Sequence, residues 1–555
     1  MILSERPDTI GGWKVNVMKK PLVPGMSRVL TGATVILMLA LFVSAMACSS
    51  DSDTVVASGD DATTAPTRVA TSAPQPTSTT APTPVPQATA TQAPVAATSD
   101  PDEKPVNFQG SMKVNPARAT MGSEVTVSGT GLPGNTELAL NWSTVDGEWN
   151  IKGERNEEYH GRVFTPRTIL LATVKTDSSG DFIQTITVPD DFGFTHNLTL
   201  ETDAAILNRA GFFVEPTASI SPTSGPLGTP ITVTMKGVGY AYLENSFMLM
   251  YDNQFTGVLT SVTTNGTAMA VIPATGSVGT HVLRILHGAF NYPYLNGQQN
   301  PHPDQPFFNL EFEIMEGDPI LPLPAAQQGF PIVAGTAPEQ SGTGPSVWLD
   351  TISGPINTPV TLHGQGFAPG TEVEFNWFRV VGNRISGSGW DESSTTLGTV
   401  TADQSGNLEL AFETLDDLGG PHRIEAVSGG KLLATTSFLM TPSIMPMAVT
   451  SGKAGTMLTV NLKGVGWTET ANIYNFTYDN AYSGYACGFN SQGDVTVYLP
   501  LAGEPGWHFI DIYPGIYKGK EISGVQNFRI PQLTYAEDHP GEHLPAFHVA
   551  VYVEP

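Results

Sequence analysis

The residues best suited to chemistry lie near the C-terminus, in the run Glu537-Asp538-His539-Pro540-Gly541-Glu542-His543. Two histidines four residues apart around a glutamate can hold zinc when both lie on one face of a helix. Pro540 and Gly541 oppose such a helix, because proline removes a backbone donor and glycine costs conformational entropy. We therefore reject helical zinc hydrolysis. A looser metal site is the alternative to a structural loop, which we favour; its ligands would be Asp538, His539, Glu542 and His543.

Two acidic turns, at 177–181 and 403–407, are compatible with extracellular calcium. They lack the alternating ligands of an EF-hand loop. The same residue types make ordinary hairpin turns. We favour hairpins and expect no cofactor, with calcium as the alternative.

Four histidines each follow a glycine by two or three residues and open an apolar strand: His196, His281, His422 and His508. A residue that recurs at one station in four domains is better explained by structure than by catalysis, since four domains cannot share one active site. The chain also shows no G-x-S-x-G elbow and no P-loop. We therefore predict that the protein is not an enzyme and binds no nucleotide.

Aromatic residues in predicted loops are the main candidates for ligand binding. Loops at the ends of a sandwich commonly carry contacts, and tyrosine and tryptophan offer rigid, half-polar surfaces to sugars or proteins. The alternative is that these side chains pack against a neighbouring domain. The candidates are Tyr292, Tyr294, Tyr513, Tyr517, Trp149 and Trp390.

Internal repeats dominate the organisation of the chain. Lys236-Gly237-Val238-Gly239-Tyr240 recurs later in the chain as Lys463-Gly464-Val465-Gly466-Trp467. Upstream of each copy, Asn141-Trp142 recurs as Asn376-Trp377. The order of units is therefore A-B-A′-B′.

Short strands with alternating polarity and frequent turns fill each unit, as expected for immunoglobulin-like sandwiches. We predict an all-β protein with four tandem immunoglobulin-like β-sandwiches in this A-B-A′-B′ duplication. The expected bounds are 1–47 for a signal region, 48–107 for a lipidated cysteine and disordered linker, 108–215 for A, 216–316 for B, 317–345 for a Pro/Gly-rich hinge, 346–441 for A′ and 442–555 for B′.

The start of the second unit, Ser221-Pro222-Thr223-Ser224-Gly225-Pro226-Leu227-Gly228-Thr229-Pro230-Ile231-Thr232-Val233, resembles the opening of IPT/TIG domains. The third unit is similar from Ile352 to Phe367, and the first and fourth match more weakly. The resemblance covers about the first third of each unit. It implies an immunoglobulin-like fold serving as a spacer or binding module, and implies little about activity.

The N-terminal residues predict that the protein is located at the cell surface. Basic residues precede an apolar run from Ala33 to Val43, which is short for a membrane span. Ala45-Met46-Ala47-Cys48 then resembles the lipobox of a bacterial lipoprotein, which implies lipidation at Cys48. An ordinary cleaved signal or an uncleaved anchor is the alternative. From Ser49 to Asn107 the chain has no aromatic residue and is rich in Thr, Pro and Ala, which predicts a disordered tether.

The amino-acid composition of the chain limits the classes of partner that it can bind. The chain of 555 residues has a formal charge of −26, which argues against nucleic-acid binding, because that binding needs basic residues to neutralise phosphates. Two cysteines exclude a disulfide scaffold. The favoured hypothesis is a non-catalytic lipoprotein of the cell envelope, anchored by lipid with its domains outside, that binds an extracellular glycan or protein in adhesion. A passive structural stalk comes second, and a metal-dependent secreted hydrolase third.

Overall fold

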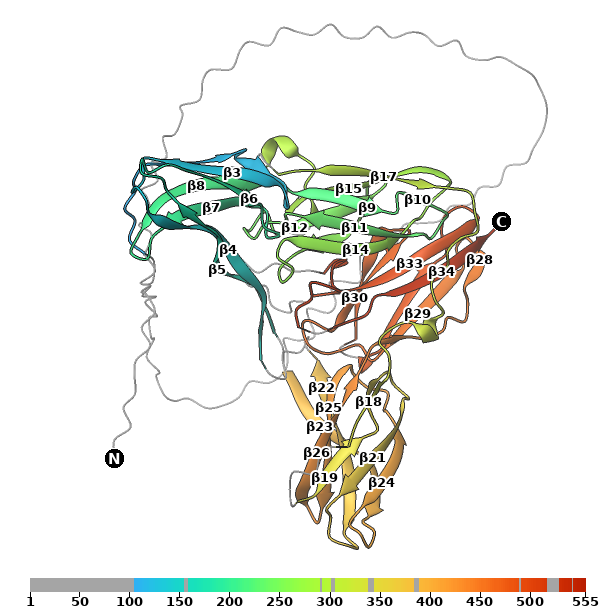
Figure 1. Cartoon of the computed structure of the whole chain (residues 1–555). Helices are drawn as coiled ribbons and strands as arrows, with labels where there is room; N and C mark the ends of the chain where they lie inside the picture. Colours follow the sequence, from blue (N-terminus) through green and yellow to red (C-terminus); the bar gives the residue numbers. More distant parts are fainter. Residues whose placement is uncertain are drawn as a thin grey trace, which may run out of the picture. The chain divides into compact units, whose positions relative to one another are not determined.

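The computed structural model describes residues 104–153, 158–289, 292–300, 305–337, 344–383, 389–488, 491–516, 529–541 and 543–555. Within these ranges the protein is all-β, without an α-helix; its only helical elements are the 3₁₀ turns η1 (Gly297–Gln299) and η2 (Ala325–Gln327). The described strands form eight sheets, which fall into four pairs along the chain (Figure 1). No helix among these residues has the length and apolar character needed to cross a membrane.

The first sheet pair joins a three-stranded sheet, ordered β1-β3-β6, to a five-stranded sheet, ordered β2-β8-β7-β4-β5. Strands β4 and β5 continue past their sheet as a long hairpin (Figure 1). The strands are β1 (Ser111–Asn115), β2 (Arg118–Ala119), β3 (Glu124–Thr130), β4 (Glu137–Lys152), β5 (Glu158–Lys175), β6 (Phe182–Thr187), β7 (Phe194–Glu201) and β8 (Ile206–Val214).

The second sheet pair has the orders β14-β11-β9 and β10-β17-β15-β12-β13, with β16 added beside β15. Its strands are β9 (Thr217–Ser221), β10 (Ser224–Gly225), β11 (Pro230–Lys236), β12 (Ser246–Tyr251), β13 (Gln254–Thr260), β14 (Thr267–Pro273), β15 (Gly279–Ala289), β16 (Tyr292–Pro293) and β17 (Phe308–Ile314).

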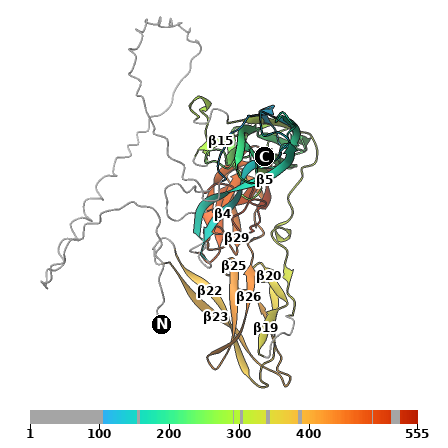
Figure 2. The ribbon, with the colours of Figure 1, turned by 60° about the vertical axis from the view of Figure 1, so that its left-hand side comes forward.

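The third sheet pair has the orders β19-β21-β24 and β18-β20-β26-β25-β22-β23, and its long β22–β23 hairpin is clearest in Figure 2. Its strands are β18 (Val333–Ala334), β19 (Ser346–Leu349), β20 (Thr351–Gly354), β21 (Pro359–Gln365), β22 (Glu372–Asn383), β23 (Gly389–Thr401), β24 (Leu408–Glu413), β25 (Gly420–Ser428) and β26 (Lys431–Met440).

The fourth sheet pair has the orders β27-β29-β32 and β28-β34-β33-β30-β31. Its strands are β27 (Ser443–Ile444), β28 (Ser451–Lys453), β29 (Met457–Lys463), β30 (Ile473–Tyr478), β31 (Ala481–Cys487), β32 (Val495–Pro500), β33 (Gly506–Gly515) and β34 (Phe547–Glu554).

All four sheet pairs share one topology. In each, a short early strand runs parallel to the last strand: β2 beside β8, β10 beside β17, β20 beside β26 and β28 beside β34. The remaining ladders are antiparallel, as in immunoglobulin-like sandwiches. The alternation that predicted strands also orients them, since every second residue of β3, β11, β21 and β29 is buried. These inward residues build a separate hydrophobic core in each pair.

The repeated Lys-Gly-Val-Gly motif lies at the junction between consecutive sheet pairs. The Gly193 amide donates to the Val238 carbonyl at 3.1 Å, and the Gly419 amide donates to Val465 in the same way. A Cβ on Gly193 would come within 1.9 Å of the Gly237 carbonyl oxygen. The two backbones meet this closely only because the position has no side chain. The duplicated unit is therefore a pair of sandwiches together with its junction.

The described part of the predicted hinge, 317–337 and 344–345, contacts neighbouring sheets at a few points, although none of its residues is buried. The Ile320 amide donates to the Leu227 carbonyl at 2.8 Å. The Gln328 side chain both donates to the His548 carbonyl and accepts from the His548 amide, each at 2.7 Å. Ala325 packs on the core of the fourth sheet pair. This segment is therefore tied by hydrogen bonds to the second and fourth sheet pairs.

Candidate binding surface between the second and fourth sheet pairs

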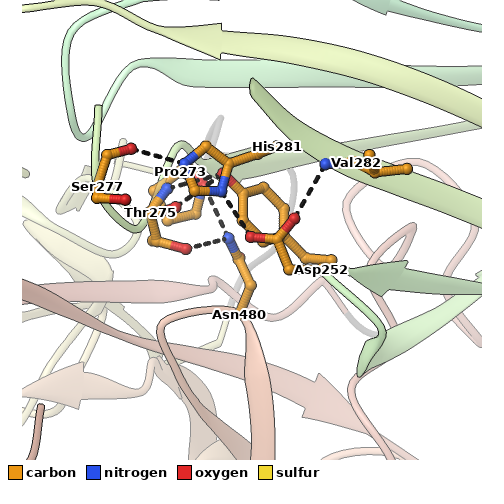
Figure 3. Close-up of polar contacts among 8 residues, drawn as sticks. Asp252, Pro273, Thr275, Ser277, His281, Val282 and Asn480 are labelled. Atoms are coloured by element: carbon orange, nitrogen blue, oxygen red, sulfur yellow. Dashed lines mark hydrogen bonds and ion pairs between the residues drawn. The ribbon is translucent and has the colours of Figure 1, made fainter. Parts of the chain in front are cut away.

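The recurring histidines belong to two kinds of structural cluster. In the second sheet pair the His281 ring stacks on Tyr251, with centroids 5.6 Å apart. Its Nδ1 lies 2.5 Å from an Asp252 carboxylate oxygen, and its Nε2 lies 2.7 Å from the Ser277 carbonyl (Figure 3). The other Asp252 oxygen accepts from the Val282 amide. Both ring nitrogens therefore face acceptors and tie a turn to the strands.

The fourth sheet pair repeats this arrangement at the equivalent positions of the duplicated unit. His508 Nδ1 lies 2.5 Å from Asp479 and its Nε2 lies 2.9 Å from the Glu504 carbonyl. The hydrogen bond to the Asp479 carboxylate raises the pKa of His508 above its usual value, against the opposing effect of burial. Tyr478 again lies beside the imidazole.

The first and third sheet pairs use a tryptophan in place of the tyrosine. The His196 ring stacks on Trp142 at 4.4 Å, and the indole donates to buried Asp191 at 2.9 Å. His422 stacks on Trp377 at 4.5 Å, and that indole donates to Asp417. All four histidines share one station, as the sequence predicted: each is the third residue of its strand, and each Nε2 lies against the carbonyl of the residue four positions earlier. The two types of unit differ in the stacked aromatic ring and in the Nδ1 partner, which is a backbone carbonyl in the first and third pairs and an aspartate in the second and fourth.

Asn480 links the second and fourth sheet pairs at the edge of the His281 cluster. Its side-chain amide donates to the Pro273 carbonyl at 2.8 Å and to the Thr275 hydroxyl at 3.0 Å (Figure 3). Thr275 also accepts, through its carbonyl, from the Tyr251 hydroxyl. The contact therefore joins the second sheet pair's own turn to the neighbouring pair.

The segment 529–541 of the fourth unit forms a backbone seam on β13 of the second sheet pair. The Val258 amide donates to the Pro531 carbonyl at 2.8 Å, and the Leu533 amide donates to the Val258 carbonyl at 3.0 Å. The Thr534 hydroxyl contacts both the amide and the hydroxyl of Thr260. The seam extends the sheet of one unit with chain from another.

Asp538 closes this seam as a buried acceptor, 1% exposed. Its carboxylate accepts from the Thr260 hydroxyl at 2.6 Å, from the Val262 and Thr263 amides at 2.9 Å and from the Thr263 hydroxyl at 3.0 Å. The Trp149 indole of the first sheet pair donates a fifth bond, at 3.1 Å. One carboxylate thus joins three sheet pairs, and its oxygens are occupied by protein donors.

The other predicted metal ligands lie beside this anchor. The rings of His539 and His543 have centroids 3.8 Å apart. Burial, and then the neighbouring His543, lower the pKa of His539. Glu542 lies outside the described residues. Among the residues that the structure describes, no three or more His, Cys, Asp or Glu side chains are grouped to hold a metal ion.

The predicted aromatic loop residues are distributed differently from one another. Tyr513 lies in strand β33 and not in a loop, and it is 3% exposed because it packs on the second sheet pair's core. Trp149 lies in strand β4 and is also buried, in a cluster with residues of the second and fourth units. Both occupy packing positions, the alternative to ligand binding. Tyr517 and the Trp390 side chain lie outside the described residues, although the Trp390 backbone belongs to β23.

An exposed group of aromatic residues gathers where the second and fourth sheet pairs meet. Tyr292 is 57% exposed and its ring lies 6.0 Å from that of half-buried Phe255. Phe255 in turn meets Tyr482 of the fourth pair edge-on, at 6.2 Å. Tyr485 is 46% exposed. We call Phe255, Tyr292, Tyr482 and Tyr485 the aromatic strip.

A β-bulge explains why Tyr482 and Tyr485 share a face. Gly484 pairs with Phe476 and Tyr482 with Thr477, so Ser483 is the extra residue. The bulge shifts the alternation by one residue. Burial, with Tyr292 and Tyr485 nearby, raises the pKa of Tyr482, whose hydroxyl donates to the Arg529 carbonyl. Tyr294, the remaining candidate, is half-buried beside β15.

The fold defines the class of protein: an all-β protein built from immunoglobulin-like sandwiches. No family model matches the chain, and no curated protein matches it. Among solved structures, methylamine-reacted alpha-2-macroglobulin from Salmonella is 9% identical with a TM-score of 0.17, over 81% of this chain and 31% of that one. The chain therefore spans about a third of the macroglobulin's length.

Two further solved structures match this chain over a larger share of their own length. A putative membrane anchored protein from Corynebacterium diphtheriae is 10% identical with a TM-score of 0.15, over 60% of this chain and 89% of that one. The adhesin InvE from Yersinia pseudotuberculosis is 15% identical with a TM-score of 0.15, over 37% and 59%. These similarities are too weak to assign a family or a function.

Replacement of Asp538 tests its role as an anchor. We expect Asp538→Ala to lower the free energy of unfolding by about 3 kcal/mol or more, because it leaves several buried donors unsatisfied. Denaturant titration followed by circular dichroism measures this change. Asp318→Ala, at an exposed aspartate, is the matched control and should have little effect. Equal stabilities of the two variants would contradict the anchor.

Proposed function

We propose that this protein is a non-catalytic lipoprotein of the cell envelope, displayed outside the cell, whose sandwiches bind an extracellular glycan or protein. The observation that carries the proposal is the aromatic strip. Tyr292 and Tyr485 keep about half of their surface exposed, at 57% and 46%, although both adjoin a buried junction.

The geometry of the strip suits recognition. Single exposed aromatics are ordinary on protein surfaces, but here residues from two sheet pairs adjoin one another. Tyrosine lost to solvent on binding contributes a large apolar area and a hydroxyl, with few rotatable bonds to order. The strands beneath are fixed by the seam and by Asn480, so little backbone entropy is lost when a partner binds.

The histidine clusters support a non-catalytic role. In each of them both imidazole nitrogens face a carboxylate or backbone oxygen, as at His281 and His508. A general base needs a nitrogen lone pair directed at substrate. These histidines instead fasten turns to strands.

The N-terminal sequence supports the proposed location at the outside of the cell envelope. Ala45-Met46-Ala47-Cys48 resembles a lipobox, and the Thr/Pro-rich tether after it would hold the sandwiches away from the membrane. A cysteine that carries more than one acyl chain attaches a protein stably to a membrane.

Replacement of the lipidated residue tests the anchor. We expect Cys48→Ser to move the chain from the membrane fraction to the soluble or secreted fraction, because no acyl chain can be attached. Fractionation with immunoblotting, and mass spectrometry of the N-terminal peptide, measure this. Cys487→Ser is the control and should leave the chain on the membrane. An unmodified Cys48 in the native protein would contradict the anchor.

Binding assays test the strip. The full chain, with and without calcium or chelator, is titrated with the producing cell's envelope fractions and with purified polysaccharides. We expect saturable binding to one fraction, weakened about tenfold or more by Tyr292→Ala with Tyr485→Ala. Tyr498→Ala, at an exposed tyrosine of β32 away from the strip, is the matched control.

Each outcome of this assay has a reading. Binding that the double variant leaves unchanged would contradict the strip. No binding to any fraction would favour the passive stalk. Loss of binding on chelation would add a calcium site.

A further inference from the structure

A cavity of about 220 Å³ lies at the junction of the third and fourth sheet pairs. Its walls come from β22, β23, β25 and β26 of the third pair and from the turn that precedes β30 in the fourth. We call it the junction pocket. Its lining includes Arg379, Glu392, Gly420, Arg423, Ser437 and Trp467.

The duplicated chain provides its own comparison for this pocket. Gly420 and Phe194 occupy the same station: each begins the corresponding strand, and each pairs with the last residue of the next strand, Met440 or Val214. Both have a positive φ, of 105° and 69°. A bulky residue at positive φ is strained and persists only where packing holds it.

Phe194 packs into the second pair's core at the first junction, beside a pocket of about 210 Å³ whose lining includes Phe164, Tyr240 and Asn245. The Phe194 side chain is 2% exposed. Its ring lies so close that a Cβ on Gly239 would come within 2.7 Å of it. At the second junction, by contrast, the atom nearest to a Cβ built on Gly420 is the Trp467 indole nitrogen, at 3.8 Å. Gly420 therefore leaves open the space beside the Trp467 indole, and both residues line the junction pocket.

The walls of the junction pocket carry charged side chains of both signs. The Arg379 side chain is 26% exposed, and its buried Nε forms an ion pair with Asp417 at 3.3 Å. Arg423 pairs with Glu392 at 3.0 Å and lies over the Phe378 ring at 4.0 Å. Arg379, Arg423 and Glu392 line the pocket, so guanidinium donors and a carboxylate acceptor adjoin the space.

The charges in and around the pocket are balanced or slightly negative. Arg379 and Arg423 are the cations, whereas Asp417, Glu392 and Glu425 are paired with them. These described residues leave no surplus positive charge to attract an anion. A ligand with neutral hydroxyl groups would use the donors and acceptors together, while its apolar face could contact the indole of Trp467.

We propose that the junction pocket binds one uncharged sugar residue, such as the end of a neutral glycan. The volume is below the range of about 300–1,000 Å³ usual for drug-sized ligands, which favours a single ring. This site is separate from the aromatic strip and does not depend on it. It would give the protein a second, end-specific contact with a glycan.

The test uses the full chain and defined probes. Methyl glucoside, methyl mannoside, methyl galactoside and N-acetylglucosamine are the neutral probes, with glucuronate and inorganic phosphate as the charged ones. Calorimetry and saturation-transfer NMR measure binding. We expect saturable binding of at least one neutral probe, weakened about tenfold or more by Arg379→Gln and by Gly420→Phe.

Controls keep the proposal falsifiable. Gly420→Phe adds a bulky ring to the wall of the junction pocket, and Arg379→Gln serves if that variant fails to fold. Tyr498→Ala, at an exposed tyrosine outside both sites, is the matched control and should leave probe binding unchanged. Probe binding that is lost in Tyr292→Ala with Tyr485→Ala but kept in Arg379→Gln would place the probe on the strip and overturn the proposal. Absence of binding by every neutral probe, binding of glucuronate or phosphate alone, or unchanged affinity in Arg379→Gln would each overturn the proposal.

Discussion

A buried carboxylate that accepts five hydrogen bonds is the contact on which the junction of three sheet pairs depends. Asp538 belongs to the fourth unit, yet its donors come from the second pair and from Trp149 of the first. An unpaired buried carboxylate is very costly, so the contact is stable only when all partners are docked. The neighbouring backbone seam at Val258 then fixes the register. The aromatic strip is a consequence of this docking, since its residues come from both pairs.

Duplication followed by divergence explains how one fold carries different surfaces. The Gly193 and Gly419 junctions have the same backbone contact, because each needs a position without a side chain. Around this constant frame the side chains differ. Phe194 packs into the second pair's core at one junction, whereas Gly420 lines the pocket beside Trp467 at the other. Similarly, Phe255 and Tyr482 occupy equivalent stations but only the tyrosine has a hydroxyl to bond to Arg529.

The sequence predicted the fold well because strand signals are local. Alternation along β3 and β11 directly orients side chains to the core, and the constant spacing of the repeated motifs aligned the second and fourth units. Docking between units was not predictable in this way. Tyrosine and tryptophan are common at exposed binding sites, but the side chains of Tyr513 and Trp149 are buried by residues distant in the sequence. Aspartate is a common metal ligand, but the carboxylate of Asp538 accepts hydrogen bonds from residues that are distant in the chain, in the first and second sheet pairs. The predictions for Cys48, Glu542 and Tyr517 concern residues outside the described ranges.

The most direct test of the account is whether the strip binds only when the seam is closed. The measurement is the affinity of full-length Asp538→Ala for the envelope fraction that the native chain binds, at a temperature where circular dichroism shows all strands folded. The account predicts a loss of about tenfold or more, although Tyr292 and Tyr485 are both intact. Native affinity in this variant would show that binding does not depend on the docked arrangement, and would contradict the account.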